Sequence, residues 1–198
     1  MDYIFGYGSL ICADSRSRTG VTGSALPIEI KGIARRWSVH SPEWNATAVG
    51  AHLSPESLCN GVYFPVDADN LARFDQREMG YQRINIEWSS VTALTDVPLP
   101  TQGTLWAYVG DNHGEPTSER PITQSYLDVI LNGCFDYGPD FAAKFTELTQ
   151  QWQHLVNDRH QPLYPRPLQS TERIHHIDQF VQKHLPTLWK QRKTLRHH

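Results

Sequence analysis

The chain has 198 residues, a formal net charge of −3 and a hydrophobic content of 39%, which fit one globular domain with or without a helical appendix. No apolar run approaches the roughly 20 residues of a membrane span, and the first residues lack the features of a secretory signal, so a cytoplasmic location is expected. The 18 Lys and Arg residues are scattered, which argues against nucleic-acid binding, and three distant cysteines argue against a disulfide framework.

Short strands are expected in the first part of the chain, where runs of β-branched and aromatic residues are separated by glycine and proline. The expected strands cover residues 1–5, 28–39, 46–53, 61–66, 81–94 and 103–109. Alternation places Ile84, Ile86 and Trp88 on one face of their strand, and Trp106 with Tyr108 on one face of theirs.

Helices are expected mainly after Pro121, where apolar residues recur at helical spacing. The three apolar stripes contain Tyr126, Leu127, Ile130 and Leu131, ended by Asn132 and Gly133; Phe141, Phe145, Leu148, Trp152 and Leu155; and Ile174, Ile177, Phe180, Val181 and Leu185. Pro186 is expected to end or kink the last helix. Strands followed by helices predict an α+β fold with a curved sheet or a small barrel.

One shorter helix is predicted between the strands, over residues 67–79, with Asp67 as its N-cap and Gly80 just beyond its end. Leu71, Phe74 and Glu78 share one face of this helix.

Glu78 is therefore expected to point inward, whereas Arg73 and Arg77 point elsewhere and leave it without a partner in its own helix. Burial raises the pKa of such a carboxyl group, which makes Glu78 a candidate general base. The alternative is a surface glutamate near a fraying helix end, as most glutamates are.

A glycine-containing loop, Gly6–Leu10, follows directly on the first predicted strand. Its two glycines permit close approach of a ligand and leave backbone N–H groups free to face an anion or a carbonyl group. The loop lacks the third glycine of a dinucleotide fingerprint, the Gly-Lys-Ser/Thr of a phosphate loop and the spacing of a serine nucleophile elbow. Taken alone, it is more simply an ordinary glycine turn.

No metal site or covalent nucleophile is predicted. The ten histidines show no metal-ligand spacing, and the cysteines are not paired as in a zinc site. Cys134 lacks the local pattern of a catalytic cysteine and is expected to be a small buried thiol.

Four segments in the same order resemble the γ-glutamylcyclotransferase superfamily, and most closely its glutathione-specific, ChaC-like members. Phe5–Leu10 resembles the opening motif of the family, and Gly32–Ser38 resembles its Gly-x-x-Arg-Arg strand. Phe74–Tyr81 resembles the segment that carries the catalytic glutamate, and Pro121–Leu127, followed by Gly133, resembles a late helix.

The resemblance implies a small mixed β-barrel flanked by helices, formed by residues 1–150, with residues 151–198 as a helical extension packed on the same domain. It also implies conversion of a γ-glutamyl compound (glutathione, or a γ-glutamyl amino acid or amine) to 5-oxoproline and a free amine by intramolecular lactam formation. The partner is then a small molecule, and no metal or organic cofactor is required.

Within this family pattern, Glu78 takes the catalytic role. The α-ammonium group of the substrate has an ordinary pKa of about 8, and a glutamate whose pKa is raised by burial to ~6–7 is competent to remove its proton. The expected substrate-binding residues are the loop after the first strand and three tyrosines: Tyr7, Gly8, Ser9, Leu10, Tyr81, Tyr108 and Tyr126. Tyr126 matches the family pattern best, and the alternative for each of the three is a core tyrosine with a satisfied hydroxyl.

Other readings of the sequence remain open. Arg35 and Arg36 lie on a predicted strand, where they are either surface residues or partners of a carboxylate. The chain is alternatively a non-catalytic protein that binds a γ-glutamyl ligand, or a regulatory protein, on the same scaffold. A third hypothesis is an interaction protein whose partner binds the helical extension 151–198.

Overall fold

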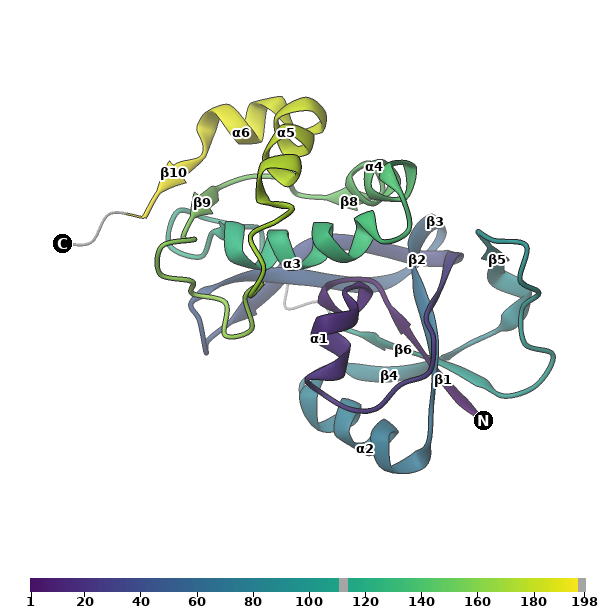
Figure 1. Cartoon of the computed structure of the whole chain (residues 1–198). Coiled ribbons are helices and arrows are strands. Elements are labelled where there is room, and N and C mark those ends of the chain that lie inside the picture. Colours follow the sequence, from purple (N-terminus) through teal and green to yellow (C-terminus); the bar gives the residue numbers. More distant parts are fainter. Residues whose placement is uncertain (111–113, 196–198) are drawn as a thin grey trace.

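The computed structural model describes residues 1–110 and 114–195, and these form an α+β fold with one curled mixed sheet (Figure 1). The strands of this sheet are β1 (Asp2–Gly6), β2 (Leu26–Ser41), β3 (Ala46–Val66), β4 (Gln82–Ile86), β5 (Val91–Ala93), β6 (Thr104–Val109) and β8 (Thr149–Gln150). Their order is β4-β6-β1-β3-β2-β5, with β8 paired to β2. The predicted α+β class is confirmed, with the barrel present as a curled half-barrel.

The curl of the sheet follows from how its two edges are connected. β4 and β5 occupy opposite edges of the strand order, yet only the short segment Glu87–Ser90 joins them. A flat sheet cannot place strands so close in sequence at opposite edges, so the sheet bends back on itself. The single strand predicted over residues 81–94 is therefore wrong: the 3₁₀ turn η2 (Trp88–Ser90) divides it.

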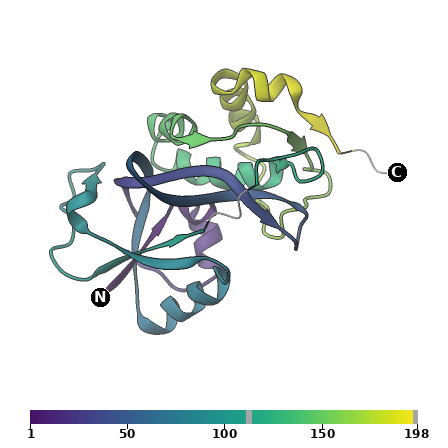
Figure 2. The same cartoon turned by 180° about the vertical axis from the view of Figure 1, so that it is seen from behind.

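A long antiparallel hairpin, β2–β3, forms the other part of the sheet (Figure 2). The two strands predicted over residues 46–53 and 61–66 are one continuous strand, because β2 pairs with it along almost its whole length. The register shifts between Lys31 and Gly32, where Gly32 has a φ of +101°. Such a bulge absorbs the mismatch in length between the strands and bends the hairpin.

The helices are α1 (Ala13–Ser17), α2 (Ala68–Arg77), α3 (Gln124–Phe135), α4 (Pro139–Glu147), α5 (Ile174–His184) and α6 (Pro186–Gln191), and the 3₁₀ turn η1 (Ser9–Ile11) precedes α1. α3 is buried on nearly all sides. It continues through Asn132 and Gly133, where an end was predicted. Gly133 serves close packing, since a Cβ there would lie 2.5 Å from the backbone N of Cys12.

The second predicted stripe, which ended at Leu155, is only partly helical. α4 stops at Glu147, and the chain then becomes extended in β8 and β9 (Leu155–Asn157). Trp152 still reaches the core, with its ring centroid 5.3 Å from that of Trp37. Apolar side chains can face one core from either conformation, so spacing alone did not separate them.

α5 and α6 lie on the side of α3 away from α1 and α2, whereas the loop between β9 and α5 passes α3 toward α1, as Figure 1 shows. α5 ends just before Pro186, as predicted, and Pro186 then begins α6. β7 (Ile122–Thr123), β9 and β10 (Lys193–Thr194) form a small parallel sheet. No helix in the described residues has both the length and the hydrophobicity to span a bilayer.

Candidate functional site

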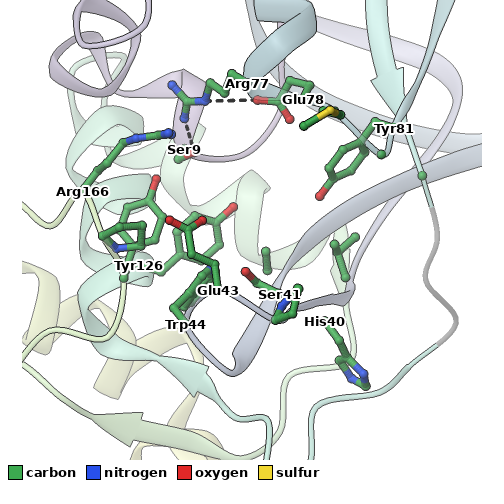
Figure 3. A pocket seen from close by; sticks show the side chains of 18 residues that line it. Ser9, His40, Ser41, Glu43, Trp44, Arg77, Glu78, Tyr81, Tyr126 and Arg166 are labelled. Carbon is green, nitrogen blue, oxygen red and sulfur yellow. Dashed lines mark hydrogen bonds and ion pairs between the residues drawn. The ribbon is translucent and has the colours of Figure 1, made fainter.

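A cavity of about 340 Å³ opens between the turn of the β2–β3 hairpin, the end of α2 and the loop that follows β9 (Figure 3). A smaller recess of about 50 Å³ lies beside it, against the loop after β1. Four residues line both spaces and therefore mark their junction: Ser9, Glu78, Tyr81 and Tyr126.

The loop after β1 forms one wall of the smaller recess, which Tyr7, Gly8, Ser9 and Leu10 all line. η1 closes the loop, with the backbone N of Ile11 donating to the carbonyl of Gly8 at 2.9 Å. A Cβ on Gly8 would lie only 3.2 Å from Cγ2 of Val49 and 3.3 Å from the hydroxyl of Tyr126. Both contacts would be tighter than ordinary ones, so glycine suits the close packing of this loop against Val49 and Tyr126.

Arg35 holds this loop from behind. Its guanidinium donates to the carbonyl of Tyr7 at 3.2 Å, to two oxygens of Asn60 at 2.6 and 2.8 Å, and to Phe145 and Thr149. The side chain is fully buried and all of these acceptors are neutral, so Arg35 is neither a surface residue nor the partner of a carboxylate, the two alternatives expected for it. Burial lowers the pKa of Arg35.

Glu78 lies directly after α2, whose N-cap Asp67 accepts from the backbone N of Asn70, as predicted. A reverse turn follows, closed by a hydrogen bond of 2.9 Å from the backbone N of Tyr81 to the carbonyl of Glu78. Gly80 has a φ of +107° in this turn, which glycine readily adopts. The turn places Tyr81 on the same side of the cavity as Glu78, with its hydroxyl pointing into the cavity (Figure 3).

The Glu78 carboxylate has a cationic partner, contrary to the prediction. Nε of Arg77 lies 3.2 Å from Oε1 of Glu78. Helical spacing separates neighbouring side chains by about 100°, but α2 ends at Arg77, and Glu78 has left the helix with a φ of −93° and a ψ of 24°. The helical spacing that predicted separate directions for Arg77 and Glu78 therefore does not apply at Glu78.

Burial raises the pKa of Glu78, and the positive charges of Arg77 and Arg166 oppose this effect without cancelling it. The side chain of Glu78 is 18% exposed, so it meets the cavity with part of its surface. A carboxyl group in this state is a stronger base than an ordinary glutamate once it is ionised.

The tyrosines differ in what their hydroxyl groups do. Tyr7 donates to the carbonyl of Tyr108 at 2.6 Å, and Tyr108 donates to Oδ1 of Asp75 at 2.7 Å, so both hydroxyl groups are occupied. Tyr81 and Tyr126 line both cavities. Burial raises the pKa of Tyr81, with Glu78 adding to the effect, so Tyr81 remains protonated at neutral pH.

Comparison with solved structures identifies the fold. The chain matches a structure described as a γ-glutamyl cyclotransferase with a TM-score of 0.58 and 15% identity, over 91% of this chain and 98% of the other. The chain has the γ-glutamylcyclotransferase fold. An uncharacterized human protein matches with a TM-score of 0.57 and 18% identity, over 74% of this chain and 86% of the other. YkqA from Bacillus subtilis matches with a TM-score of 0.52 and 17% identity, over 73% of this chain and 52% of the other.

No family model matches the sequence, and a search of the curated proteins found no match. At 15–18% identity the structural likeness defines the fold alone, so the chemistry has to be argued from the side chains. Within the γ-glutamylcyclotransferase fold of this chain, every residue expected at the site lines at least one of the two adjoining cavities.

Several lining residues have no signal in the sequence. Arg166 follows β9, in the part of the chain where no motif was found, and it points toward the cavity from the side opposite Tyr81 (Figure 3). His40, Glu43 and Trp44 come from the turn of the β2–β3 hairpin. Only contacts between distant segments place these residues at the site.

Metal and thiol chemistry receive no support from the geometry. Among the residues that the structure describes, no group of three or more potential metal ligands lies close enough to hold an ion. Cys134 is buried, as predicted, and burial raises the pKa of its thiol.

Proposed function

We propose that the protein is a γ-glutamylcyclotransferase that converts a γ-glutamyl compound to 5-oxoproline and a free amine, with Glu78 as the general base. The observation that carries this proposal is the position of Glu78. Its carboxyl group, with a pKa raised by burial, lies where the larger cavity meets the recess formed by the loop after β1. The γ-glutamylcyclotransferase fold supports the same reaction class.

The reaction begins at the α-ammonium group of the substrate. The Glu78 carboxylate removes one proton, and the neutral amine then attacks the γ-carbonyl carbon of the same molecule. A C–N bond forms, and the electrons of the carbonyl double bond move to its oxygen. Both groups belong to one molecule, so holding the chain in a folded conformation supplies much of the acceleration, since effective molarities can reach ~10⁵–10⁸ M.

The second stage expels the amine. Protonated Glu78 delivers its proton to the departing nitrogen as the original C–N bond breaks and the carbonyl group reforms. The attacking nitrogen then gives its second proton to Glu78, which passes it to the product amine and so leaves that amine as an ammonium group. The ring nitrogen keeps one of the three original protons, and Glu78 ends as the carboxylate. Charge and protons balance within the substrate, so this chemistry needs no redox cofactor.

The surroundings of Glu78 suit the remaining requirements. The Tyr81 hydroxyl is a protonated donor beside the base, and among the described residues no hydrogen bond already engages it. The small recess beside Gly8 and Ser9 suits the α-amino-acid end of the γ-glutamyl group, where backbone groups can orient it. Glutathione and γ-glutamyl amino acids or amines are the proposed substrates.

The test is to incubate the purified protein with glutathione and with a set of γ-glutamyl amino acids and amines, and to measure 5-oxoproline. Glu78→Gln is expected to abolish turnover, whereas Glu147→Gln, an exposed glutamate on α4, is the matched control that should not. Absence of product from every compound would overturn the proposal. Binding of a γ-glutamyl compound without turnover would instead favour a ligand-binding or regulatory protein.

A further inference from the structure

Two arginines line the larger cavity, and they differ in how many partners their guanidinium groups have. Arg77 is fully engaged, because it donates to Ser9, Ser15 and Thr19 besides pairing with Glu78. Arg166 lines the same cavity, yet within the described part of the chain it forms no ion pair and donates no hydrogen bond. Glu78 lines the same cavity, and the positive charge of Arg166 acts to lower its pKa. Arg166 is thus a cation available for an anionic ligand.

The backbone around Arg166 is stiff. Arg166 stands between Pro165 and Pro167, whose rings fix their own φ angles and push the preceding residues toward extended conformations. The carbonyl of Pro167 also accepts from the guanidinium of Arg18 at 3.4 Å. The backbone of such a segment loses little conformational entropy when the side chain it carries binds a ligand.

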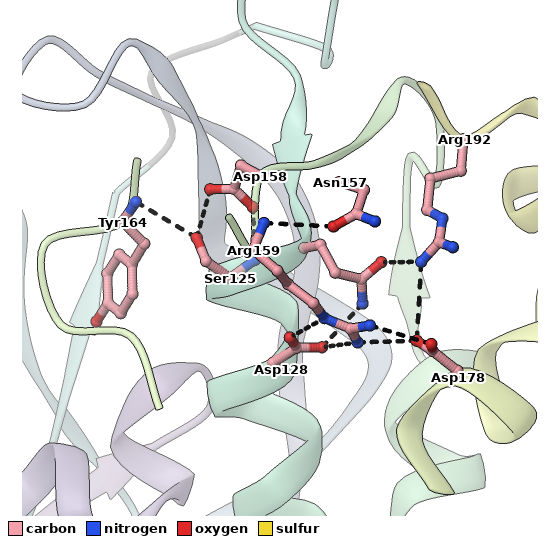
Figure 4. Close-up of polar contacts among 9 residues, drawn as sticks. Ser125, Asp128, Asn157, Asp158, Arg159, Tyr164, Asp178 and Arg192 are labelled. Carbon is pink, nitrogen blue, oxygen red and sulfur yellow. Dashed lines mark hydrogen bonds and ion pairs between the residues drawn. The ribbon is translucent and has the colours of Figure 1, made fainter. Parts of the chain in front are cut away.

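Contacts with α3 fix the same segment upstream (Figure 4). The buried carboxylate of Asp158 accepts from the backbone N and the hydroxyl of Ser125, at 2.8 and 2.6 Å, and from the backbone N of Leu163 at 2.8 Å. Ser125 lies in the first turn of α3, where the helix dipole favours a negative charge. Asp158 therefore ties the chain just before Arg166 to the buried helix.

Tyr164 completes the anchoring. Its ring centroid lies 4.7 Å from that of Tyr126 and 5.3 Å from that of Trp44, and all three residues line the larger cavity. Two residues further along, Arg166 lines the same cavity as Tyr126. Arg166 is thus a partly buried arginine on an anchored segment, a position suited to binding a ligand in the cavity.

We propose that Arg166 binds a carboxylate on the leaving group of the substrate, so that the protein prefers γ-glutamyl amino acids or peptides to γ-glutamyl amines. This inference rests on the proposed cyclotransferase function. If the recess by the β1 loop takes the glutamyl end and Glu78 stands at the reacting bond, the departing amine occupies the larger cavity. Arg166 lines that cavity and not the recess. A guanidinium group matches a carboxylate by paired, charge-assisted hydrogen bonds.

The experiment compares two matched substrates that differ only in that carboxylate. One pair is γ-glutamylalanine and γ-glutamylalaninamide; the other is glutathione and its analogue with a terminal glycinamide. Wild type, Arg166→Gln, Arg166→Lys and Arg73→Gln are measured with whichever pair the wild type turns over. Arg73 is an exposed arginine on α2 outside both cavities, and its variant controls for the loss of one positive charge. Comparing variants removes the difference in leaving-group basicity between the two substrates.

Arg166→Gln is expected to lower kcat/KM for the carboxylate substrate by about 10- to 100-fold, mainly through KM, and to change the amide by less than about 3-fold. Arg166→Lys should recover part of the loss. An equal loss with both substrates, or no loss with either, would overturn the role of Arg166. In that case, formation of 5-oxoproline by the wild type would still support the cyclotransferase function. A wild type that forms no 5-oxoproline would overturn both.

Discussion

Arg77 lies with its Nε 3.2 Å from Oε1 of Glu78 while its Nη2 donates to the hydroxyl of Ser9 at 3.1 Å. One side chain thus connects the end of α2 to the loop after β1, two segments about 70 residues apart in sequence. Arg77 therefore fixes the position of the candidate base, Glu78, relative to the candidate substrate loop. Arg77 itself does not line the small recess.

Replacement of Arg77 by Gln is therefore expected to change both the geometry and the acidity of the site. The positive charge of Arg77 lowers the pKa of Glu78, so its loss raises that pKa further. The base must be ionised to act, and the acid limb of kcat/KM against pH should move to higher pH. We also expect kcat to fall roughly 10-fold or more from misplacement of the base. An acid limb that moves to lower pH, or one that moves equally in Arg73→Gln, would contradict this expectation.

Glu78→Gln should stabilise the protein at neutral pH even though it abolishes turnover. Because burial raises the pKa of Glu78 in the folded state, the folded protein binds more protons than the unfolded chain between the ordinary pKa of about 4.3 and the raised value. The stability of the wild type therefore falls as pH rises through this window, whereas Gln does not titrate. Thermal unfolding from pH 4 to pH 8 tests this. The advantage of the variant in Tm should grow with pH, and a constant difference would refute the linkage.

Arg35→Met should destabilise the fold by about 3 kcal/mol. The change leaves oxygens of Tyr7, Asn60 and Phe145 without a buried donor, each worth about 1–3 kcal/mol, which outweighs the relief of burying one charge less. Urea unfolding measures the change, and Arg73→Met, at an exposed position, should stay within about 0.5 kcal/mol of the wild type. A stabilised Arg35→Met would show that the desolvation penalty dominates instead.

The sequence predicted the fold and much of the site because those features are local. The loop after β1 and the N-cap Asp67 each depend on neighbours within a few residues, and local spacing predicts such features well. Glu78 faces the cavity as predicted, but from just beyond the end of the helix. The pairing of Glu78 with Arg77 was missed because the helix ends at Arg77, two residues before the predicted end at residue 79.

Features that depend on contacts between distant segments were not predictable. The segment that carries Arg166 is attached to α3 by Asp158 and to the cavity wall by Tyr164, and no spacing in the sequence records these contacts. The course of the chain after Glu147 was mistaken for helix for a similar reason, since Trp152 packs into the core from an extended segment. Gly133 was taken as a helix end, although its role is set by Cys12 from another element.

The segment after residue 150 is predicted to unfold together with the sheet. Phe180 on α5 is almost fully buried and packs edge-to-face on Phe135 of α3, with ring centroids 5.2 Å apart. Phe180→Ala should therefore cost about 3–5 kcal/mol. Leu53→Ala, at a position 66% exposed on β3, is the control and should change stability little.

Hydrogen exchange of the native protein decides whether this loss is shared. Protection of the β1 amides should fall by the same free energy as protection of the α5 amides, because one cooperative unit opens as a whole. If α5 exchanged faster while β1 kept its full protection, the segment after residue 150 would be a separate unit. The anchoring of Arg166 would then be independent of the stability of the sheet.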